Sequence, residues 1–273
     1  MKKLRVAVLT GGPFAEHESS LLSGEAVRRA LAEANHEVVP VLIKRDGDWS
    51  ISPSELKEIA DLVFVAMHGK YGEDGMVQDT LKEAGMRYTG TNALSSALAI
   101  NKFLTGRFFR ALGFRTPRFA ALERADSGYF QLDFDFPVMV KPVNRGLSLG
   151  VGLDREPGEL PLTPVEIVPK RAAFHDYYTK YSPDISEIIF PASLSGRERD
   201  LVEAAGLLAH QAIGAAGVSK TDMILDTSGR LYLLEINTIP SFVEAGALSR
   251  AASGYGLSLA EVCERIIKAA LAA

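Results

Sequence analysis

The amino-acid sequence predicts an α/β protein whose first third is a doubly wound domain, a parallel sheet with helices on both faces. Continuous apolar runs of the kind found in buried parallel strands recur at LRVAVLT, HEVVPVLI and DLVFVAMHG. Segments with helical periodicity alternate with these runs, from about Ser20 to Ala34 and again in MVQDTLKEAG, which Gly85 closes. Strands that alternate with helices in short cycles are typical of a parallel sheet covered on both faces.

The remaining elements follow from the same periodicities. A second unit begins near Asn92, where LSSALAINKFLTGRFFRALG has helical periodicity and ends at Gly113, a suitable C-cap. FPVMVKP is predicted to be a short strand, and the proline- and glycine-rich region from Asp154 to Pro164 an irregular connection. The last third is predicted to contain a strand at VEIVP, a helix from Arg197 to about Ala215, a hairpin of TDMIL and RLYLLEIN, and a closing amphipathic helix.

Composition excludes several classes of protein. The 273 residues, 47% hydrophobic and 23% charged, are typical of a globular protein with room for more than one core. A formal net charge of -4 provides no basic stripe, so we expect no nucleic-acid partner. The single cysteine, Cys263, excludes an internal disulfide and a cysteine-based zinc site. No run is long enough for a membrane span, and Gly11 ends the first apolar run too early for a signal peptide, so we expect a cytoplasmic protein without a membrane partner.

The predicted hairpin near the C-terminus carries three oxygen-bearing side chains. Pairing across its DTSG turn places Asp222 opposite Leu233. The period of two then brings Asp222, Glu235 and Asn237 to one face, within reach of one shared ion. Carboxylate and amide oxygens suit Mg²⁺. The alternative is an ordinary solvated face, on which carboxylates are common, but the apolar surroundings in YLLEIN favour the metal.

A glycine-rich loop and two lysines are candidates for phosphate binding. Lys141 ends a predicted strand, and the loop from Asn144 to Gly152 follows it. Glycines allow backbone N–H groups to surround a phosphate, and a lysine supplies charge. The loop does not match the P-loop or the dinucleotide-binding pattern, and such a loop can also merely turn the chain. Lys102 lies in a predicted helix, where a lysine is more often a solvated residue.

Together these segments resemble the D-alanine–D-alanine ligase family over nearly the whole chain. AMHGKYGEDGMVQ is similar to the HG-x-x-GEDG-x-x-Q signature of that family, which is the most specific of its motifs. GGPFAEHESSLLSG resembles its glycine turn and substrate motif, and YTGTNALSSALAINK the stretch that leads to its nucleotide-binding lysine. FPVMVKP through LSLGV resembles its phosphate-binding hairpin, FHDYYTKY its F-Y-D-Y-x-x-K-Y segment, and LYLLEINTIP its metal-binding strand and oxyanion turn.

The resemblance implies an ATP-grasp fold and a reaction. The implied domains are an N-terminal substrate domain over residues 1–94, a central α+β domain over 95–164 that is shortened near 154–164, and a C-terminal α+β catalytic domain over 165–273. The implied activity is the ATP-dependent joining of two D-alanines through an acylphosphate, for peptidoglycan synthesis. The implied cofactors are ATP and Mg²⁺, with Mn²⁺ as a substitute, and the implied assembly is a homodimer.

The resemblance also implies roles for individual residues. Catalytic roles fall on four of them: Glu16, Ser148, Tyr181 and Lys220. Substrate-binding roles fall on Ser19, His68, Ser241 and Gly246. ATP-binding roles fall on Lys102, Lys141, Gly146, Gly150 and Lys180. The implied metal ligands are Asp222, Glu235 and Asn237.

Several of these positions depart from the pattern of the family. Lys220 stands where the family usually has an arginine, which loses a planar bidentate fork. Ser241 replaces the glycine of the oxyanion turn, and Gly246 the serine expected to hold the carboxylate of the second substrate. Further changes are found at Leu147, in the glycine loop, and at His175 and Tyr178.

A larger departure is an apparent internal deletion. Between Val151 and Val165 the family carries a helix, a strand and the hinge that contacts adenine, together roughly forty residues or one helix-plus-strand unit. Here only a short segment is present, with a junction near Glu156 and Pro157. Two alternatives therefore remain beside an active ligase. One is a catalytically weak homologue that acts as a binding protein, and the other is a ligase that takes D-lactate or D-serine as its second substrate.

Overall fold

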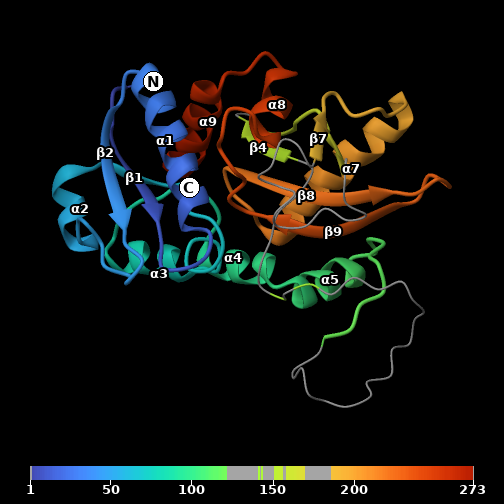
Figure 1. The fold of residues 1–273 in the computed structure, drawn as a ribbon, viewed down its shortest axis with the longest axis horizontal. Coiled ribbons are helices and arrows are strands. Elements are labelled where there is room, and N and C mark those ends of the chain that lie inside the picture. Colours follow the sequence, from blue (N-terminus) through green and yellow to red (C-terminus); the bar gives the residue numbers. More distant parts are fainter. Residues whose placement is uncertain are drawn as a thin grey trace.

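The structure is a computed structural model that describes residues 2–121, 141, 143, 151–155, 158–169 and 186–272 (Figure 1). Its N-terminal part is built on three parallel strands in the order β2-β1-β3. These strands are β1 (Arg5–Gly11), β2 (Glu37–Ile43) and β3 (Leu62–Val65). The helices of this part are α1 (His17–Glu33), α2 (Pro53–Ile59) and α3 (Met76–Glu83). The predicted parallel sheet with alternating helices is thus confirmed.

The apolar runs of β1 and β3 are continuous because these strands are covered on both faces, whereas the edge strand β2, also predicted to be buried, has exposed residues. Val6, Ala7, Val8 and Leu9 of β1 are all 0% exposed. Burial of both faces also accounts for β3, in which all four residues are buried. The carboxyl ends of β1 and β3 lead directly into the GGPFAEHESS and HGKYGEDG segments, so the fold brings these two motifs to the same edge of the sheet.

The helical segment after Asn92 is two helices, which corrects the prediction of one. α4 (Ala93–Ile100) ends and α5 (Lys102–Ala111) begins at Asn101. Asn101 adopts an extended ψ of 97°, and its side chain accepts a hydrogen bond from Leu104 N at 3.0 Å. Asparagine favours this N-cap over a helix interior because its side chain satisfies a free backbone donor. Lys102 consequently becomes the first residue of a new helix.

A second, four-stranded sheet has the order β5-β4-β8-β9. Its strands are β4 (Val151–Arg155), β5 (Gly158–Pro161), β8 (Val218–Leu225) and β9 (Leu231–Asn237). The irregular connection predicted from Asp154 to Pro164 is therefore wrong, since β4 and β5 form an antiparallel hairpin in which Arg155 pairs with Gly158. The predicted junction at Glu156 and Pro157 lies outside the described residues. Pairing of β4 with β8 orders a segment that has no periodicity of its own.

The other elements cover this sheet or extend it. They are α7 (Gly196–Ile213), α8 (Ala247–Ser253), α9 (Leu259–Ala272) and a two-stranded sheet of β6 (Glu166–Pro169) and β7 (Ser186–Ile189). α5 and α7 pack on β9 (Figure 1). Together with Ala99 of α4, their contact forms a small core of apolar side chains, namely Phe109, Ala209, Ile213, Leu233 and Ile236. None of the helices that the structure describes combines the length and apolar character of a membrane span.

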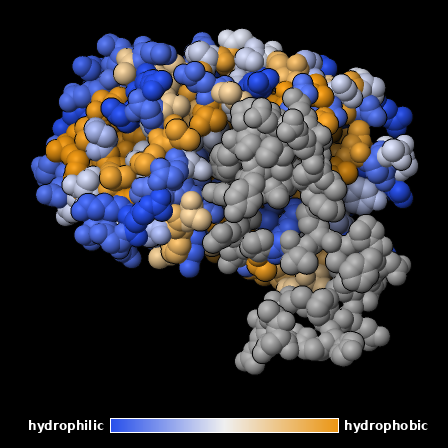
Figure 2. All heavy atoms as spheres, viewed as in Figure 1, coloured by the Kyte–Doolittle hydropathy of each residue, from blue (hydrophilic) through white to orange (hydrophobic). Residues whose placement is uncertain are grey.

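The closing helix α9 packs against α1, at the other end of the chain (Figure 1). Val262, Ile266 and Ile267 of α9 belong to the same buried cluster as the strands of the first sheet. The predicted domain boundaries stay a prediction, and this core spans residues on both sides of them. Away from it, hydrophobic and hydrophilic residues are interspersed on the face shown in Figure 2.

We expect truncation of this shared core to destabilise the protein. Ile266 is 2% exposed, and Ile266→Ala should lower the free energy of unfolding by about 2–5 kcal/mol because the buried methyl groups leave a cavity. Urea unfolding would measure the loss. Lys268→Ala, at an exposed position of the same helix, is the matched control and should change stability by about 0.5 kcal/mol or less. Equal losses in the two variants would contradict this role of α9.

Candidate active site

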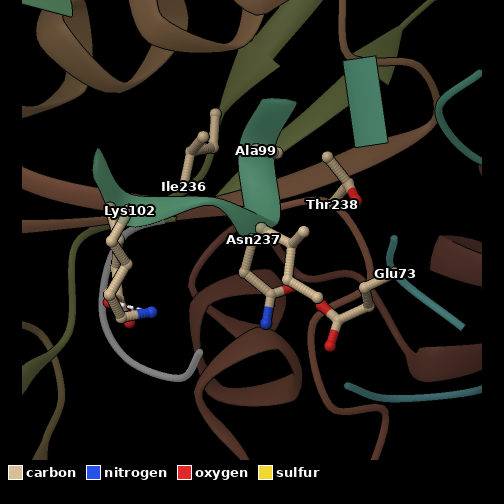
Figure 3. Close-up of a pocket in the computed structure, with 8 residues that line it drawn as sticks. Glu73, Ala99, Lys102, Ile236, Asn237 and Thr238 are labelled. Atoms are coloured by element: carbon tan, nitrogen blue, oxygen red, sulfur yellow. Dashed lines mark ion pairs between the residues drawn. The ribbon is translucent and has the colours of Figure 1, made fainter. Parts of the chain in front are cut away.

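Three segments that are distant in sequence line one small pocket (Figure 3). They are the loop after β3, the junction of α4 and α5, and the end of β9. The lining residues are Glu73, Ala99, Ile100, Lys102, Glu235, Ile236, Asn237 and Thr238. Two of the three predicted metal ligands and one predicted ATP-binding lysine are among them. The sequence prediction did not include Glu73 or Thr238.

The three predicted metal ligands lie together because of an irregularity in the hairpin. The register shifts between Asp222 and Met223, so that Asp222 pairs with Glu235. The predicted pairing of Asp222 with Leu233 was therefore wrong, since Met223 pairs with Leu233. A β-bulge inserts one extra residue into one strand, and turn sequence alone does not reveal it. The shift places the two carboxylates directly opposite each other.

Two lysines neutralise this buried pair. Lys102 Nζ lies 2.9 Å from Glu235 Oε2, and Lys220 Nζ lies 3.6 Å from Asp222 Oδ1. Lys220 itself pairs with Asn237 in the sheet register. The side chains of Lys220, Asp222 and Glu235 are only 5–7% exposed. Breaking a pair at this depth leaves an uncompensated charge, which costs about 3–5 kcal/mol.

The two carboxyl groups divide their charge unequally. Burial raises the pKa of Asp222 well above its ordinary value, and the neighbouring Glu235 carboxylate raises it further against the opposing effect of Lys220. Burial also raises the pKa of Glu235, but the Lys102 ammonium and a hydrogen bond from Asp222 outweigh it and hold this pKa far below its usual range. These surroundings therefore favour ionisation of Glu235 over ionisation of Asp222.

The donor atoms of this cluster fit a hard divalent cation. Asp222 Oδ1 is buried without a hydrogen-bond partner. The oxygen of the Asn237 amide accepts a hydrogen bond from Ile239 N at 2.8 Å and keeps a second lone pair. Within the described ranges no group of three His, Cys, Asp or Glu side chains could hold a metal ion. The set is therefore two carboxylates and one amide, which suits Mg²⁺ with water and phosphate oxygens as its other ligands.

Lysines gather around the same carboxylates. Because Lys102 begins α5, its backbone N–H has no partner within the helix, and it donates to Val143 O at 2.8 Å. Lys141, two residues before Val143, also lowers the pKa of Glu235, so its ammonium acts on the same group. Acidic ligands beside several ammonium groups form a suitable site for a metal-bound polyphosphate.

Glu16 and Glu73 meet at Gly69. A Cβ built on Gly69 would lie 2.4 Å from the Glu16 carboxyl carbon, and Gly69 has a φ of 70°, so glycine is required there. Gly69 N donates to Glu73 Oε2, and Glu73 N donates to Gly69 O at 2.8 Å. Burial raises the pKa of Glu73 to about 8, with the Glu16 charge adding to the effect and the Gly69 hydrogen bond opposing it. The signal that could have identified Glu73 in the sequence is its position as an acidic residue inside a glycine-rich motif.

His68 and Ser241 are connected through Ser23 of α1. His68 Nε2 lies 2.7 Å from Ser23 Oγ, and Ser241 Oγ lies 3.4 Å from the same oxygen. His68 Nδ1 lies 3.1 Å from Ile239 O, so both ring nitrogens have protein partners. Burial lowers the pKa of His68 to about 4. A carboxyl group of a substrate could bind this imidazole only by displacing one of these partners.

The remaining predicted site residues are less closely connected. Gly246 is the N-cap of α8, and a Cβ there would lie 2.9 Å from Val243 O. A serine at this position would therefore require a different turn. Ser19 is buried on α1. Several predicted residues lie outside the described part of the chain, namely Gly146, Leu147, Ser148, Gly150, His175, Tyr178, Lys180 and Tyr181.

We expect Glu73 to make stability pH-dependent. Its pKa is raised from 4.5 to about 8, so over this range the folded protein keeps a proton that the unfolded chain has lost. The contribution of Glu73 to stability therefore falls as the pH rises. Glu73→Gln mimics the protonated acid, so it should match the unchanged protein near pH 5 and exceed its stability near pH 8. Urea unfolding at the two pH values would measure this, and a difference independent of pH would contradict it.

Family models match two parts of the chain. A model of the D-ala D-ala ligase N-terminus matches residues 5–60, and a model of the D-ala D-ala ligase C-terminus matches residues 156–268. The crystal structure of the VanG D-Ala:D-Ser ligase from Enterococcus faecalis has a TM-score of 0.80 at 24% identity and covers 98% of this chain and 100% of that chain. This likeness confirms the predicted ATP-grasp fold.

Curated relatives extend over almost the whole sequence. The D-alanine–D-alanine ligase of Geotalea uraniireducens strain Rf4 is 34% identical over 304 residues, which cover 99% of this chain and 96% of that protein. The ligase of Anaeromyxobacter dehalogenans strain 2CP-1 is 34% identical over 302 residues, 97% of this chain and 96% of that protein. An alignment of 304 positions exceeds 273 residues, so that relative has internal residues without a counterpart here. Relatives of this identity and extent share a family, and this chain belongs to the D-alanine–D-alanine ligase family.

Proposed function

We propose that the protein joins two molecules of D-alanine at the expense of ATP. The carboxylate of the first D-alanine attacks the γ-phosphorus, and ADP leaves. The amine of the second D-alanine then attacks the acyl carbon, inorganic phosphate leaves, and the amine loses a proton. The observation that carries the proposal is one cluster of two lysines and three oxygen-bearing side chains in a chain of this family. Lys102, Glu235 and Asn237 line the pocket, and Lys220 and Asp222 pair with Asn237 and Glu235 in the sheet.

The lysines and the acidic hairpin serve the phosphoryl transfer. Lys102 and Lys141 hold phosphate oxygens, and Asp222, Glu235 and Asn237 hold Mg²⁺. The metal neutralises charge on the phosphates when it is bound. When the nucleotide binds, Lys102 exchanges its contact with the Glu235 carboxylate for contacts with phosphate oxygens. From the part of the chain beyond the described residues, Lys180 would contact the transferred group, and Gly146, Ser148 and Gly150 would close over the phosphates.

A second set of groups serves the acyl transfer. Lys220 and the backbone N–H of Ser241 stabilise the oxyanion of the tetrahedral intermediate. Glu16, which rests on Gly69, anchors the ammonium group of the first D-alanine. Ser19 and His68 are proposed neighbours of this substrate, and Tyr181 completes the catalytic set. Product would enter peptidoglycan synthesis in the cytoplasm, and the assembly would be a homodimer through the N-terminal domain.

The second-substrate site takes D-alanine in this proposal. Gly246 provides no hydroxyl, so a backbone group of its turn would hold the carboxylate. The relatives found by sequence carry the D-alanine–D-alanine ligase name, which favours this substrate over D-lactate or D-serine and an enzyme over a binding protein. The name of the structurally similar ligase from Enterococcus faecalis includes D-serine, so D-serine belongs among the substrates tested.

An assay of phosphate release tests the function. With ATP and Mg²⁺ present, addition of D-alanine should release phosphate and form D-alanyl-D-alanine, detected by mass spectrometry. The same assay with D-alanine plus D-lactate or D-serine would reveal a mixed product. Release no faster than with ATP alone would overturn the proposal, and a mixed product in preference to D-alanyl-D-alanine would replace the second substrate.

Lys220→Met should lower kcat by about 10²–10³-fold, because it removes a cation from the developing oxyanion. Lys220→Arg restores the charge and should recover part of the rate. The matched control is Lys82→Met, which removes an exposed lysine of α3 and should leave kcat unchanged. Thermal melts would establish that each variant is folded. A Lys220→Met enzyme that is folded and as fast as the control would contradict the role of Lys220.

A further inference from the structure

Ser23 lies at the centre of a hydrogen-bond chain that connects α1 to the turn after β9. Its hydroxyl is within reach of three groups: His68 Nε2 at 2.7 Å, Phe242 N at 3.2 Å and Ser241 Oγ at 3.4 Å. Ser23 is 0% exposed, so water does not replace these partners. The predicted site did not include it, since a serine on a helix has no distinctive pattern.

The direction of each hydrogen bond follows from the chemistry of its partners. The carbonyl of Ile239 can only accept, so the proton of the neutral imidazole of His68 lies on Nδ1. Nε2 then presents a lone pair and accepts the single hydroxyl proton of Ser23. Ser23 Oγ in turn accepts from Phe242 N–H, and the hydroxyl of Ser241 must be a donor to it.

The chain begins and ends on the same turn. It leaves the turn at Ser241 and Phe242, passes through Ser23 and His68, and returns at the carbonyl of Ile239. Only one arrangement of the hydroxyl and imidazole protons gives each of these groups a matching donor or acceptor. A single orientation makes such a network rigid, because no alternative arrangement leaves its buried groups satisfied.

Apolar packing holds the turn Ile239–Phe242 against β3 but does not fix the rotation of its backbone. Phe242 is 1% exposed and meets Phe64 of β3 edge-on, with ring centroids 5.3 Å apart. A contact of this kind tolerates small rotations of the backbone, whereas three directed hydrogen bonds do not. The neighbouring Ser241 N–H is the group that the proposed function aims at the oxyanion, so its direction depends on the polar chain.

We propose that Ser23 is a positioning residue for the acyl-transfer step, which acts through His68 and the turn Ile239–Phe242 to aim the Ser241 N–H. The catalytic part of this inference rests on the proposed function. The arrangement requires a neutral imidazole at His68, and the surroundings of the ring favour that form. Burial and the Lys220 charge both disfavour the imidazolium, and the pKa of His68 falls to about 4. A second proton, on Nε2, would point at the hydroxyl proton of Ser23, and the hydrogen bond between the two groups would be lost.

NMR of the ¹⁵N-histidine-labelled protein tests the hydrogen-bond chain without reference to activity. The His68 ring, assigned by its loss in His68→Gln, should carry its proton on Nδ1 at neutral pH. In Ser23→Ala the Nε2 resonance should shift because its donor is gone, while Nδ1 keeps its proton through Ile239 O. Protonation of His68 on Nε2 in the unchanged protein would overturn the inference.

Kinetics test the catalytic part. Ser23→Ala should lower kcat by about tenfold to a hundredfold with the KM for ATP unchanged, because small misplacements of a catalytic donor are costly and the nucleotide site is not involved. The matched control is Ser96→Ala, which removes a serine that is 0% exposed and has a single hydrogen bond to Thr91 O at 3.3 Å. Its kcat should equal that of the unchanged enzyme.

The outcomes separate this inference from the proposed function. Equal kcat values in Ser23→Ala and Ser96→Ala would overturn the catalytic part even if the NMR spectrum shows the expected tautomer. An unchanged enzyme that does not ligate D-alanine would overturn the proposed function, while the NMR result would still decide the hydrogen-bond chain.

Discussion

The neutralised carboxylate pair of Asp222 and Glu235 is the constraint around which the second half of the structure is arranged. Two carboxyl groups at this depth would repel each other and lose their hydration, and each therefore has a lysine beside it. Lys220 comes from β8, the strand that carries Asp222, and Lys102 from the start of α5. The hairpin and the start of α5 must keep their relative positions for these charges to be satisfied. Under the proposed function, the lysines of this cluster would bind phosphate oxygens while a metal ion binds the carboxylates.

Local irregularities of the backbone position the groups of this cluster. Asn101 ends one helix and caps the next, and so directs Lys102 toward Glu235. The bulge beside Asp222 turns a simple hairpin into one in which the carboxylates face each other. Gly69 has no side chain, which leaves room for the carboxyl group of Glu16. Each of these features departs from regular helix or strand geometry, and such departures occur where a protein positions reactive groups.

The two halves of the molecule are joined by contacts of two kinds. Apolar packing of α9 on α1 and of Phe242 on Phe64 brings the C-terminal segment onto the N-terminal sheet. Directed hydrogen bonds through Ser23 and His68 then orient the turn after β9. The shortened segment around β4 and β5 does not disturb this arrangement, since the two strands pair directly and join the sheet through β8.

The sequence by itself determined the parallel N-terminal sheet, the hairpin of β8 and β9 and the chemistry of its acidic face, because apolar periodicity and side-chain type are local properties. It also determined the family, through motifs such as HGKYGEDG that stand in a recognisable order. Only the tertiary structure decided the partner of Asp222, the break at Asn101, the strand pairing after Val151 and the positions of Glu73 and Ser23. Those features depend on which distant segments meet, and pairing, burial and proton position are set by that contact rather than by neighbours in sequence.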